Sequence, residues 1–203
     1  VQRPLLEAGA SSFIRFNEAI PILQKVKNHN EKSFSEGVSS SKPFGFRTNF
    51  KGDTIKKSDS IKLYQNGGIG YISREKIAVN PEWIDAFKVY APPLGSGSDS
   101  FPHPILGKPF VGEPDSVCTE TYLITRICKN ELEAQNVVTY LKTKFLRFLV
   151  LLNKPAQHAT AKVYKYVPEQ DFSIAWTDEK LFERYGINKA EQDFIDTLIR
   201  PME

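Results

Sequence analysis

The sequence predicts an α+β fold in which a mixed or antiparallel sheet with hairpins packs against C-terminal helices. Short runs of alternating apolar and polar residues fill residues 44–91, and this period is typical of strands. The second half instead places apolar residues about every third or fourth position, which is typical of helices. Because the strands precede the helices, an α+β arrangement is favoured over a doubly wound parallel sheet.

The N-terminal part predicts one helix followed by a loop. Apolar residues follow the helical period from Phe16 to Val26. Pro21 lies inside this pattern, so it marks either a kink or the first turn of a shorter helix that starts near Ile20. Residues 28–43 are polar and rich in serine, and we expect a loop there.

The β region is defined best by a hairpin. Two alternating runs, Ile61–Tyr64 and Ile69–Ile72, flank Asn66-Gly67, and these turn residues tolerate the positive φ angles of a tight turn. Further strands are expected at Phe87–Tyr90 and Val117–Cys128. Each of these runs is short and bounded by turn-forming residues, as strands usually are.

Residues 92–114 separate the last two strands and are rich in proline and glycine, which disfavours regular structure. Phe101, Ile105 and Leu106 are nevertheless too apolar for a pure linker. We therefore expect a partly anchored surface loop, with a tolerated insertion as the alternative.

The strongest helical pattern covers Asn130–Leu152. Asn130 is followed by Glu133 at the position that completes a capping box, and apolar residues then keep the helical spacing to the end. Three basic residues are expected on the other faces of this helix: Lys142, Lys144 and Arg147. Two shorter helices follow, the first capped by Thr177 and the second by Asn188 with Glu191.

The composition narrows the classes of protein to which this chain can belong. No run of about 18 apolar residues exists, so no transmembrane helix is expected, and the N-terminus lacks a secretory pattern. The two cysteines, Cys118 and Cys128, are too few for a disulfide framework or a zinc site and are expected to be buried thiols in a reducing cytoplasm. The chain begins at Val1, and we expect an excised fragment.

The distribution of charge separates a basic body from an acidic tail. Residues 38–168 carry 18 Lys and Arg against 11 Asp and Glu, whereas residues 169–203 carry 4 against 9. A basic body with an acidic tail facing elsewhere fits binding to a polyanion. A solvated basic helix face explains the same charges equally well.

Motifs for catalysis are missing. Gly67-Gly68 is followed by a strand pattern, so it fits a hairpin better than a cofactor-binding turn. Asn80-Pro81-Glu82-Trp83 has Glu82 where an adenine methyltransferase carries a second proline, and we interpret it as a turn capped by Asn80. The histidines are scattered and no nucleophile elbow is present. The sequence therefore indicates no catalytic, cofactor-binding or metal-ligating residue in this chain.

The second half contains a series of motifs that resembles one family. They are TETYL at Thr119–Leu123, AQNVVTYLKTKFLRFLV at Ala134–Val150, YVPEQDF at Tyr166–Phe172, WTDEKLF at Trp176–Phe182 and Tyr185-Gly186, with SKPFGFRTNF at Ser41–Phe50 and FKVY at Phe87–Tyr90 upstream. Together they resemble the C-terminal region of type II restriction–modification adenine-specific DNA methyltransferases, some of which are fused restriction–modification enzymes.

The resemblance implies a TaqI-like specificity domain that recognises double-stranded DNA beside a catalytic methyltransferase domain of the same parent chain. S-adenosylmethionine is implied as a cofactor for that parent, and none is expected in this fragment, which alone is not expected to be catalytic. We expect a helical lead-in at residues 1–33, a DNA-recognition α/β body at 34–168 and an acidic helical appendage at 169–203. Alternatives are a contribution to DNA cleavage in a fused endonuclease, or a module that docks other subunits.

The candidates for DNA contact are basic and amide residues expected on loops. Lysine and arginine would hold phosphates, and asparagine, glutamine and arginine would read base edges. The candidates are Lys42, Arg47, Asn49, Lys51, Arg74, Lys108, Gln157, His158 and Lys162. Each also fits a solvated surface residue. The loop at residues 92–114 is expected to tighten on DNA, with Lys108 near a phosphate.

Overall fold

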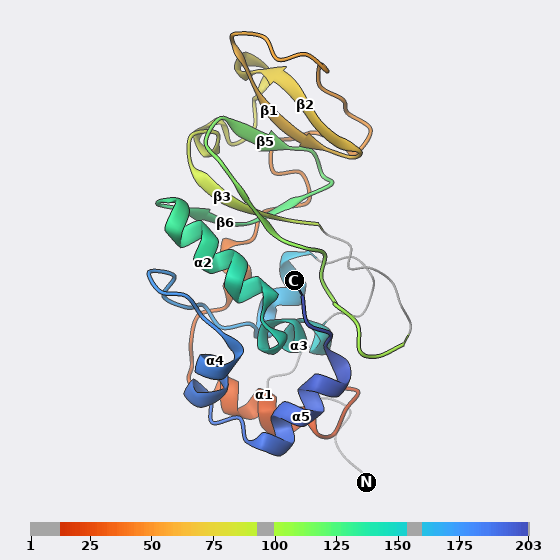
Figure 1. Ribbon diagram of the computed structural model, residues 1–203, viewed down its shortest axis with the longest axis vertical. Helices are drawn as coiled ribbons and strands as arrows, with labels where there is room; N and C mark the ends of the chain where they lie inside the picture. The colour runs from red at the N-terminus through yellow and green to blue at the C-terminus, as the bar shows by residue number, and fades with distance from the viewer. Residues whose placement is uncertain (1–12, 93–99, 154–159, 203) are drawn as a thin grey trace.

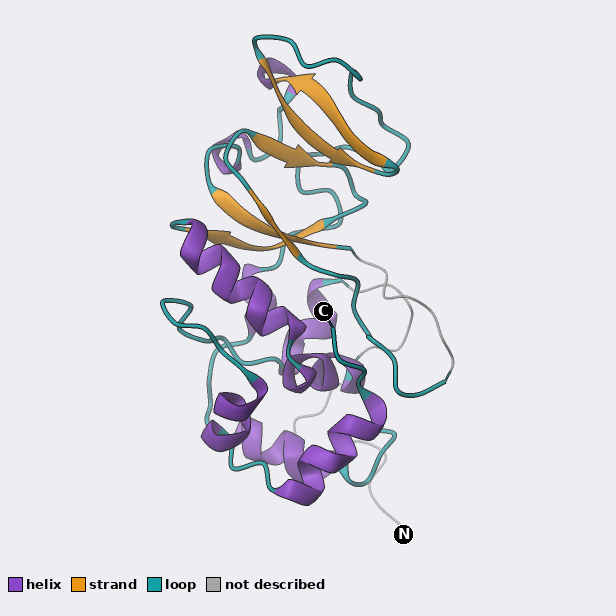
Figure 2. Ribbon diagram, in the orientation of Figure 1, coloured by secondary structure: helices purple, strands orange, loops and turns teal. Residues whose placement is uncertain are grey.

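The computed structural model describes residues 13–92, 100–153 and 160–202, and these residues form an α+β fold. Strands gather toward one end of an elongated molecule and helices toward the other (Figures 1 and 2). We call residues 39–91 and 110–128 the β lobe, and residues 13–38, 100–109, 129–153 and 160–202 the helical lobe. The expected division of the chain at residues 33 and 168 stays a prediction.

The first sheet contains the hairpin expected from the sequence. It is formed by β1 (Ser60–Gln65), β2 (Gly68–Ser73) and β5 (Ser116–Cys118) in the order β2-β1-β5. β1 pairs antiparallel with β2 and parallel with β5. Gly67 in the turn has a φ of 85°, a left-handed conformation that glycine adopts without steric cost.

The second sheet is antiparallel and corrects one expected strand. It is formed by β3 (Phe87–Ala91), β4 (Phe110–Gly112) and β6 (Leu123–Cys128) in the order β4-β3-β6. The single strand expected at Val117–Cys128 is therefore wrong, because β5 and β6 belong to different sheets. Between them the amide of Tyr122 donates to the carbonyl oxygen of Thr119 at 3.1 Å, which reverses the chain.

The helical lobe supplies the larger core. Its helices are α1 (Ala19–Lys27), α2 (Glu131–Lys142), α3 (Lys144–Leu152), α4 (Asp178–Arg184) and α5 (Lys189–Leu198). The short 3-10 helices of the described chain are η1 (Phe34–Gly37), η2 (Arg74–Lys76), η3 (Pro81–Trp83) and η4 (Ala161–Tyr166). α1 confirms the shorter helix with Pro21 in its first turn, and η1 lies where a continuous loop was expected.

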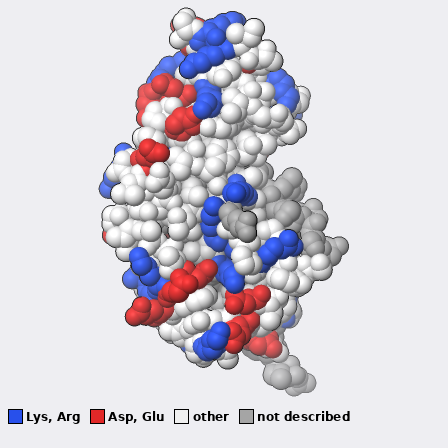
Figure 3. Space-filling view, in the orientation of Figure 1, with Lys and Arg blue, Asp and Glu red and all other residues white. Residues whose placement is uncertain are grey.

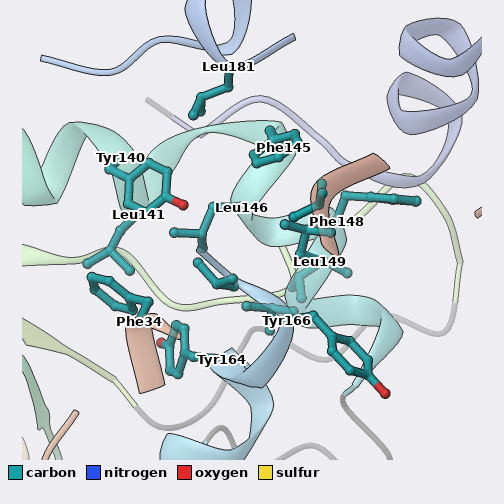
Figure 4. Close-up of a cluster of buried hydrophobic side chains, with 14 of the residues drawn as sticks. Phe34, Tyr140, Leu141, Phe145, Leu146, Phe148, Leu149, Tyr164, Tyr166 and Leu181 are labelled. Atoms are coloured by element: carbon teal, nitrogen blue, oxygen red, sulfur yellow. The ribbon is translucent and has the colours of Figure 1, made fainter. Parts of the chain in front are cut away.

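Large side chains from distant segments meet in this core (Figure 4). The labelled residues are Phe34, Tyr140, Leu141, Phe145, Leu146, Phe148, Leu149, Tyr164, Tyr166 and Leu181. The ring of Phe145 stacks on Tyr185 with the ring centroids 5.0 Å apart, so α3 is fixed against the end of α4. Complete burial of one such aromatic or aliphatic side chain stabilises the fold by about 1.5–3 kcal/mol.

The long helix expected from Asn130 to Leu152 is interrupted at Thr143. Thr143 has φ −62° and ψ 146°, an extended conformation, and its hydroxyl oxygen accepts from the amide of Leu146 at 3.2 Å. The carboxylate of Asp178 accepts from the amides of Lys144 at 3.0 Å and Phe145 at 2.8 Å. These acceptors satisfy amides that a new helix N-terminus leaves without partners, so α3 starts as a separate helix.

Arg147 is fully buried, which corrects its expected position on an outer face. The break at Thr143 redirects α3 into the protein interior, where Phe145 and Leu149 are also buried. The guanidinium of Arg147 donates to the carbonyl oxygen of Arg200 at 2.6 Å and to that of Lys142 at 2.9 Å. Burial lowers its pKa to about 10.

The helix starts expected from the sequence are mostly confirmed. Asn188 and Glu191 form the expected capping box at α5, and Thr177 caps α4. Asn130 caps α2, although the box there is incomplete because the carboxylate of Glu133 accepts from the amide of Lys129 instead. Asn80 was expected to cap a turn and does not use its side chain for this.

Candidate nucleic-acid interface

Four of the candidate residues lie on one loop of the β lobe. Lys42 has a half-exposed side chain, and Arg47, Asn49 and Lys51 are exposed. These four side chains come from ten consecutive residues, so the fold keeps them on one segment. We call residues 42–51 the basic loop.

The basic loop is anchored by Glu120, which lies between β5 and β6. The carboxylate of Glu120 accepts from the amide of Thr48 at 3.0 Å, and its own amide donates to the carbonyl oxygen of Phe46 at 2.9 Å. The bond from the Thr48 amide is the largest cause that lowers the pKa of Glu120. Lys42 forms an ion pair with Glu120 at 3.9 Å. The neighbours of Thr48, Arg47 and Asn49, are therefore exposed on an anchored segment.

Packing and the hairpin fix the other end of the basic loop. The rings of Phe46 and Phe50 stack with centroids 4.4 Å apart. The ammonium of Lys51 donates to the carbonyl oxygen of Asn66 in the turn between β1 and β2. The basic loop is therefore fixed at Glu120 near one end and at the β1–β2 turn near the other.

Arg74 does not join this group. It follows the last residue of β2, whereas Lys51 lies beside the turn where β2 begins. Its guanidinium forms ion pairs with Asp85 and, at 3.1 Å, with Asp115. These carboxylates raise its pKa, and the hydrogen bond that Arg74 donates to Asp85 contributes most. A phosphate would have to compete with two partners that Arg74 already has.

Lys108 is exposed at the end of a segment that is fixed to the helical lobe. The amide of His103 donates to the carbonyl oxygen of Leu198 at 3.1 Å, and Ile105 and Leu106 are buried. This confirms a partly anchored loop for residues 100–109. Residues 93–99, in the same expected loop, lie outside the described chain.

The remaining candidates come from the region after α3. Lys162 is exposed on η4, and its carbonyl oxygen accepts from the side-chain amide of Asn153 at 2.6 Å. Gln157 and His158 lie outside the described residues. Lys144, a further basic residue of this region, already forms an ion pair with Asp196 at 2.6 Å.

An acidic groove lies between α4 and α5. It has a volume of about 690 Å³, and its lining includes the carboxylates of Asp178, Glu179, Glu183 and Asp196 with the ring of Phe182. Figure 3 shows acidic side chains gathered toward the end of the molecule where these helices lie, with Lys and Arg side chains nearer the middle of the same face. This groove repels phosphate, so it bounds any DNA interface on that side.

Sequence reasoning missed three lysines that the fold brings together. Lys27 and Lys32 line a cavity with Lys165, which is more than 130 residues away in sequence. A backbone bridge between Ser33 and Pro168 joins the two segments. The only signal in the sequence was the run from Ala134 to Pro168 that lacks acidic residues.

The two sequence motifs that were weighed for catalysis have structural roles. Gly67 lies in the β1–β2 turn, and Gly68 is the first residue of β2 and pairs with Gln65. The side-chain amide nitrogen of Asn80 donates to the carbonyl oxygen of Pro43 at 2.7 Å, which holds η3 against the start of the basic loop. Within the described residues, no group of three or more His, Cys, Asp or Glu side chains is placed to hold a metal ion.

Both cysteines are buried free thiols. Burial raises the pKa of Cys128 to about 12 and that of Cys118 further, so neither thiol ionises near neutral pH. No helix among the described residues is long and apolar enough to cross a membrane.

Neither a protein-family model nor a curated protein sequence matches the chain. The resemblance to adenine-specific DNA methyltransferases therefore stays a prediction from the motifs.

Proposed function

We propose that this chain recognises a specific sequence of duplex DNA as the TaqI-like specificity domain of an adenine-N6 DNA methyltransferase in a restriction–modification system. The observation that carries the proposal is the basic loop, because it is held by Glu120 and by the hairpin turn while Arg47, Asn49 and Lys51 remain exposed. A firmly held loop loses little conformational entropy when it binds.

The residue types on the basic loop suit both parts of DNA recognition. Lys51 can hold a phosphate as a point charge, which positions the protein without reading sequence. Arg47 can donate two hydrogen bonds to one guanine, and Asn49 can both donate to and accept from one adenine. The loop therefore combines affinity with sequence discrimination.

The first test is the salt dependence of DNA binding. We expect the purified chain to bind a fluorescent random-sequence duplex, with log affinity falling linearly against log salt. On a random-sequence duplex Arg47 has no cognate guanine to read and can hold a phosphate as Lys51 does. Replacing Arg47 and Lys51 with alanine should therefore reduce this slope by up to about 1.8, because each phosphate contact contributes about 0.9. Fluorescence anisotropy over a range of salt concentrations measures both quantities.

The control removes the same charge elsewhere. Lys129 and Lys189 are exposed in the helical lobe, and Lys189 is paired with Asp193, so the double variant K129A/K189A should keep the slope. Absence of binding by the unmodified chain at low salt would refute the proposed function. If both double variants have the same salt slope, the basic loop is not part of the DNA interface.

The isolated chain is expected not to transfer methyl groups. Gly67 and Gly68 belong to a hairpin, and the Asn80 side chain is bonded to Pro43 rather than exposed for a flipped adenine. Incubation with labelled S-adenosylmethionine and mixed plasmid DNA should give no label in adenine. Protein-dependent labelling that survives the N80A substitution would show a catalytic site elsewhere in the chain.

In this proposal the parent protein supplies catalysis. Its methyltransferase domain would bind S-adenosylmethionine and act on the adenine that this domain selects. The two alternatives, a contribution to DNA cleavage and docking of other subunits, stay hypotheses.

A further inference from the structure

The helical lobe contains a cavity of about 320 Å³ where the end of α1 meets the end of η4. Within the described chain, its walls come from two segments, residues 26–33 and 165–168. The volume lies at the lower end of the range of about 300–1,000 Å³ that is typical of ligand pockets. None of the candidate residues in the described part of the chain lines it.

Backbone hydrogen bonds hold the two walls together. The amide of Phe34 donates to the carbonyl oxygen of Val167 at 2.8 Å, and the amide of Glu169 donates to that of Lys32 at 2.8 Å. The hydroxyl of Ser33 adds a bond to the carbonyl oxygen of Lys165 at 3.0 Å. The positions of Lys32 and Lys165 are therefore fixed relative to each other at the backbone.

The charge of the cavity is positive. Lys27, Lys32 and Lys165 line it, and Glu31 is the only acidic residue among the lining residues that the structure describes. Both carboxylate oxygens of Glu31 already accept hydrogen bonds, one from Arg184 and one from the hydroxyl of Tyr185. Arg184 compensates the charge of Glu31, so Lys32 and Lys165 give the lining a net positive charge.

Apolar walls strengthen this positive potential. Val26, Tyr166, Val167 and Pro168 form much of the lining, and a cleft with low-dielectric walls and charges of one sign concentrates the field within it. Lysine binds phosphate as a compact point charge. We propose that this cavity binds a phosphate group. The assignment of this phosphate to the DNA backbone rests on the proposed function.

Among the three lysines, replacing Lys27 would say least about phosphate binding, because Lys27 also has structural roles. It lies in the last turn of α1, where a cation also stabilises the negative end of the helix dipole, and its ammonium lies 5.9 Å from the centre of the Tyr166 ring. Lys32 and Lys165 are exposed and lie outside α-helices. Their replacement therefore tests phosphate binding with little effect on folding.

The first arm of the experiment uses duplex DNA. The variant K32A/K165A should bind a random-sequence duplex with a log–log salt slope lower by about 0.9 than that of the unmodified chain, because the cavity holds one phosphate and each phosphate contact contributes about 0.9. K129A/K189A removes the same charge and should keep the slope. Thermal unfolding followed by circular dichroism checks that both variants remain folded. If DNA binds and the two variants have the same slope, the cavity does not hold a backbone phosphate.

The second arm uses inorganic phosphate alone. Titration into the isotopically labelled chain should shift the amide resonances of Ser33 and Val167, and K32A/K165A should abolish the shifts. Phosphate shifts without any DNA binding would keep the cavity as a phosphate site while refuting the proposed function. The cavity proposal would be overturned if DNA binds but K32A/K165A changes neither the salt slope nor the phosphate-induced shifts. It would also be overturned if the chain responds neither to DNA nor to inorganic phosphate.

Discussion

Replacing Arg147 with methionine is expected to lower the free energy of unfolding by about 2–4 kcal/mol. The fully buried guanidinium donates to four carbonyl oxygens, those of Lys142, Thr143, Pro104 and Arg200. A buried polar group that loses its partner costs about 1–3 kcal/mol. Removing the desolvated charge of Arg147 offsets part of this loss. The expected decrease in stability is therefore smaller than the sum of the costs for the four carbonyl oxygens.

The comparison for this prediction is Arg184→Met. Arg184 is exposed and forms an ion pair with the mostly buried Glu31, which keeps the hydrogen bond from the hydroxyl of Tyr185 when Arg184 is replaced. Pairs with an exposed partner contribute up to about 1 kcal/mol. Urea unfolding of both variants measures the difference. A loss for R147M no larger than that for R184M would show that the carbonyl groups find other partners.

The same substitution should also loosen one segment of the candidate interface. Arg147 bonds to Pro104 and Arg200, so it ties α3 to the anchored segment that leads to Lys108 and to the chain after α5. Hydrogen exchange at residues 100–109 is expected to be faster in R147M than in R184M. The stability of the core is thus coupled to the placement of Lys108.

Local signals explain which elements were predicted correctly. The Asn66-Gly67 hairpin and the capping box at Asn188 depend on residues that are close in sequence. Each specifies its own conformation through positive φ angles or through hydrogen bonds to nearby amides. The α+β class followed from the order of such local elements.

The elements that were predicted wrongly depend on partners that are distant in sequence. Apolar spacing continues across Thr143, and the break becomes visible only when Asp178 is placed at the amides of Lys144 and Phe145. β5 and β6 likewise separate because they pair with different strands, which alternation along one segment does not reveal.

The candidate site shows the same limit. Arg47, Asn49 and Lys51 were expected on loops as candidates for DNA contact, and their exposure is observed. The ion pairs of Arg74 with Asp85 and Asp115 were not foreseen, because the three residues meet only after folding. The lysine cavity was missed for the same reason.

Replacing Lys88 with methionine is expected to remove a pH dependence of stability in the β lobe. Lys88 on β3 is fully buried, and its ammonium donates to the carbonyl oxygens of Ile84 at 3.2 Å, Glu113 at 3.1 Å and Ser116 at 3.2 Å. Ser116 belongs to β5, so this side chain joins the two sheets. Burial lowers the pKa of Lys88 from its ordinary value of 10.5 to about 8, although Glu113, Asp85 and Asp115 act in the opposite direction.

The direction of the effect follows from proton binding. Between pH 8 and pH 10.5 the unfolded chain holds the Lys88 proton more tightly than the folded chain, so stability rises with pH in this window. Cys118 acts in the opposite sense, because burial raises the pKa of its thiol and only the unfolded chain ionises it. The informative quantity is therefore the difference between the unmodified chain and K88M, which both retain Cys118.

From pH 7 to pH 10 this difference in the free energy of unfolding should change by about 2–3 kcal/mol in favour of the unmodified chain, since each pKa unit corresponds to about 1.4 kcal/mol. Urea unfolding at several pH values measures it. Lys62→Met is the control, because Lys62 is a partly exposed lysine on the neighbouring β1 whose carboxylate partner is Glu113. A constant difference between the unmodified chain and K88M across this range would mean that Lys88 keeps its ordinary pKa in the folded protein. The bonds to Ile84, Glu113 and Ser116 would then fully compensate its burial.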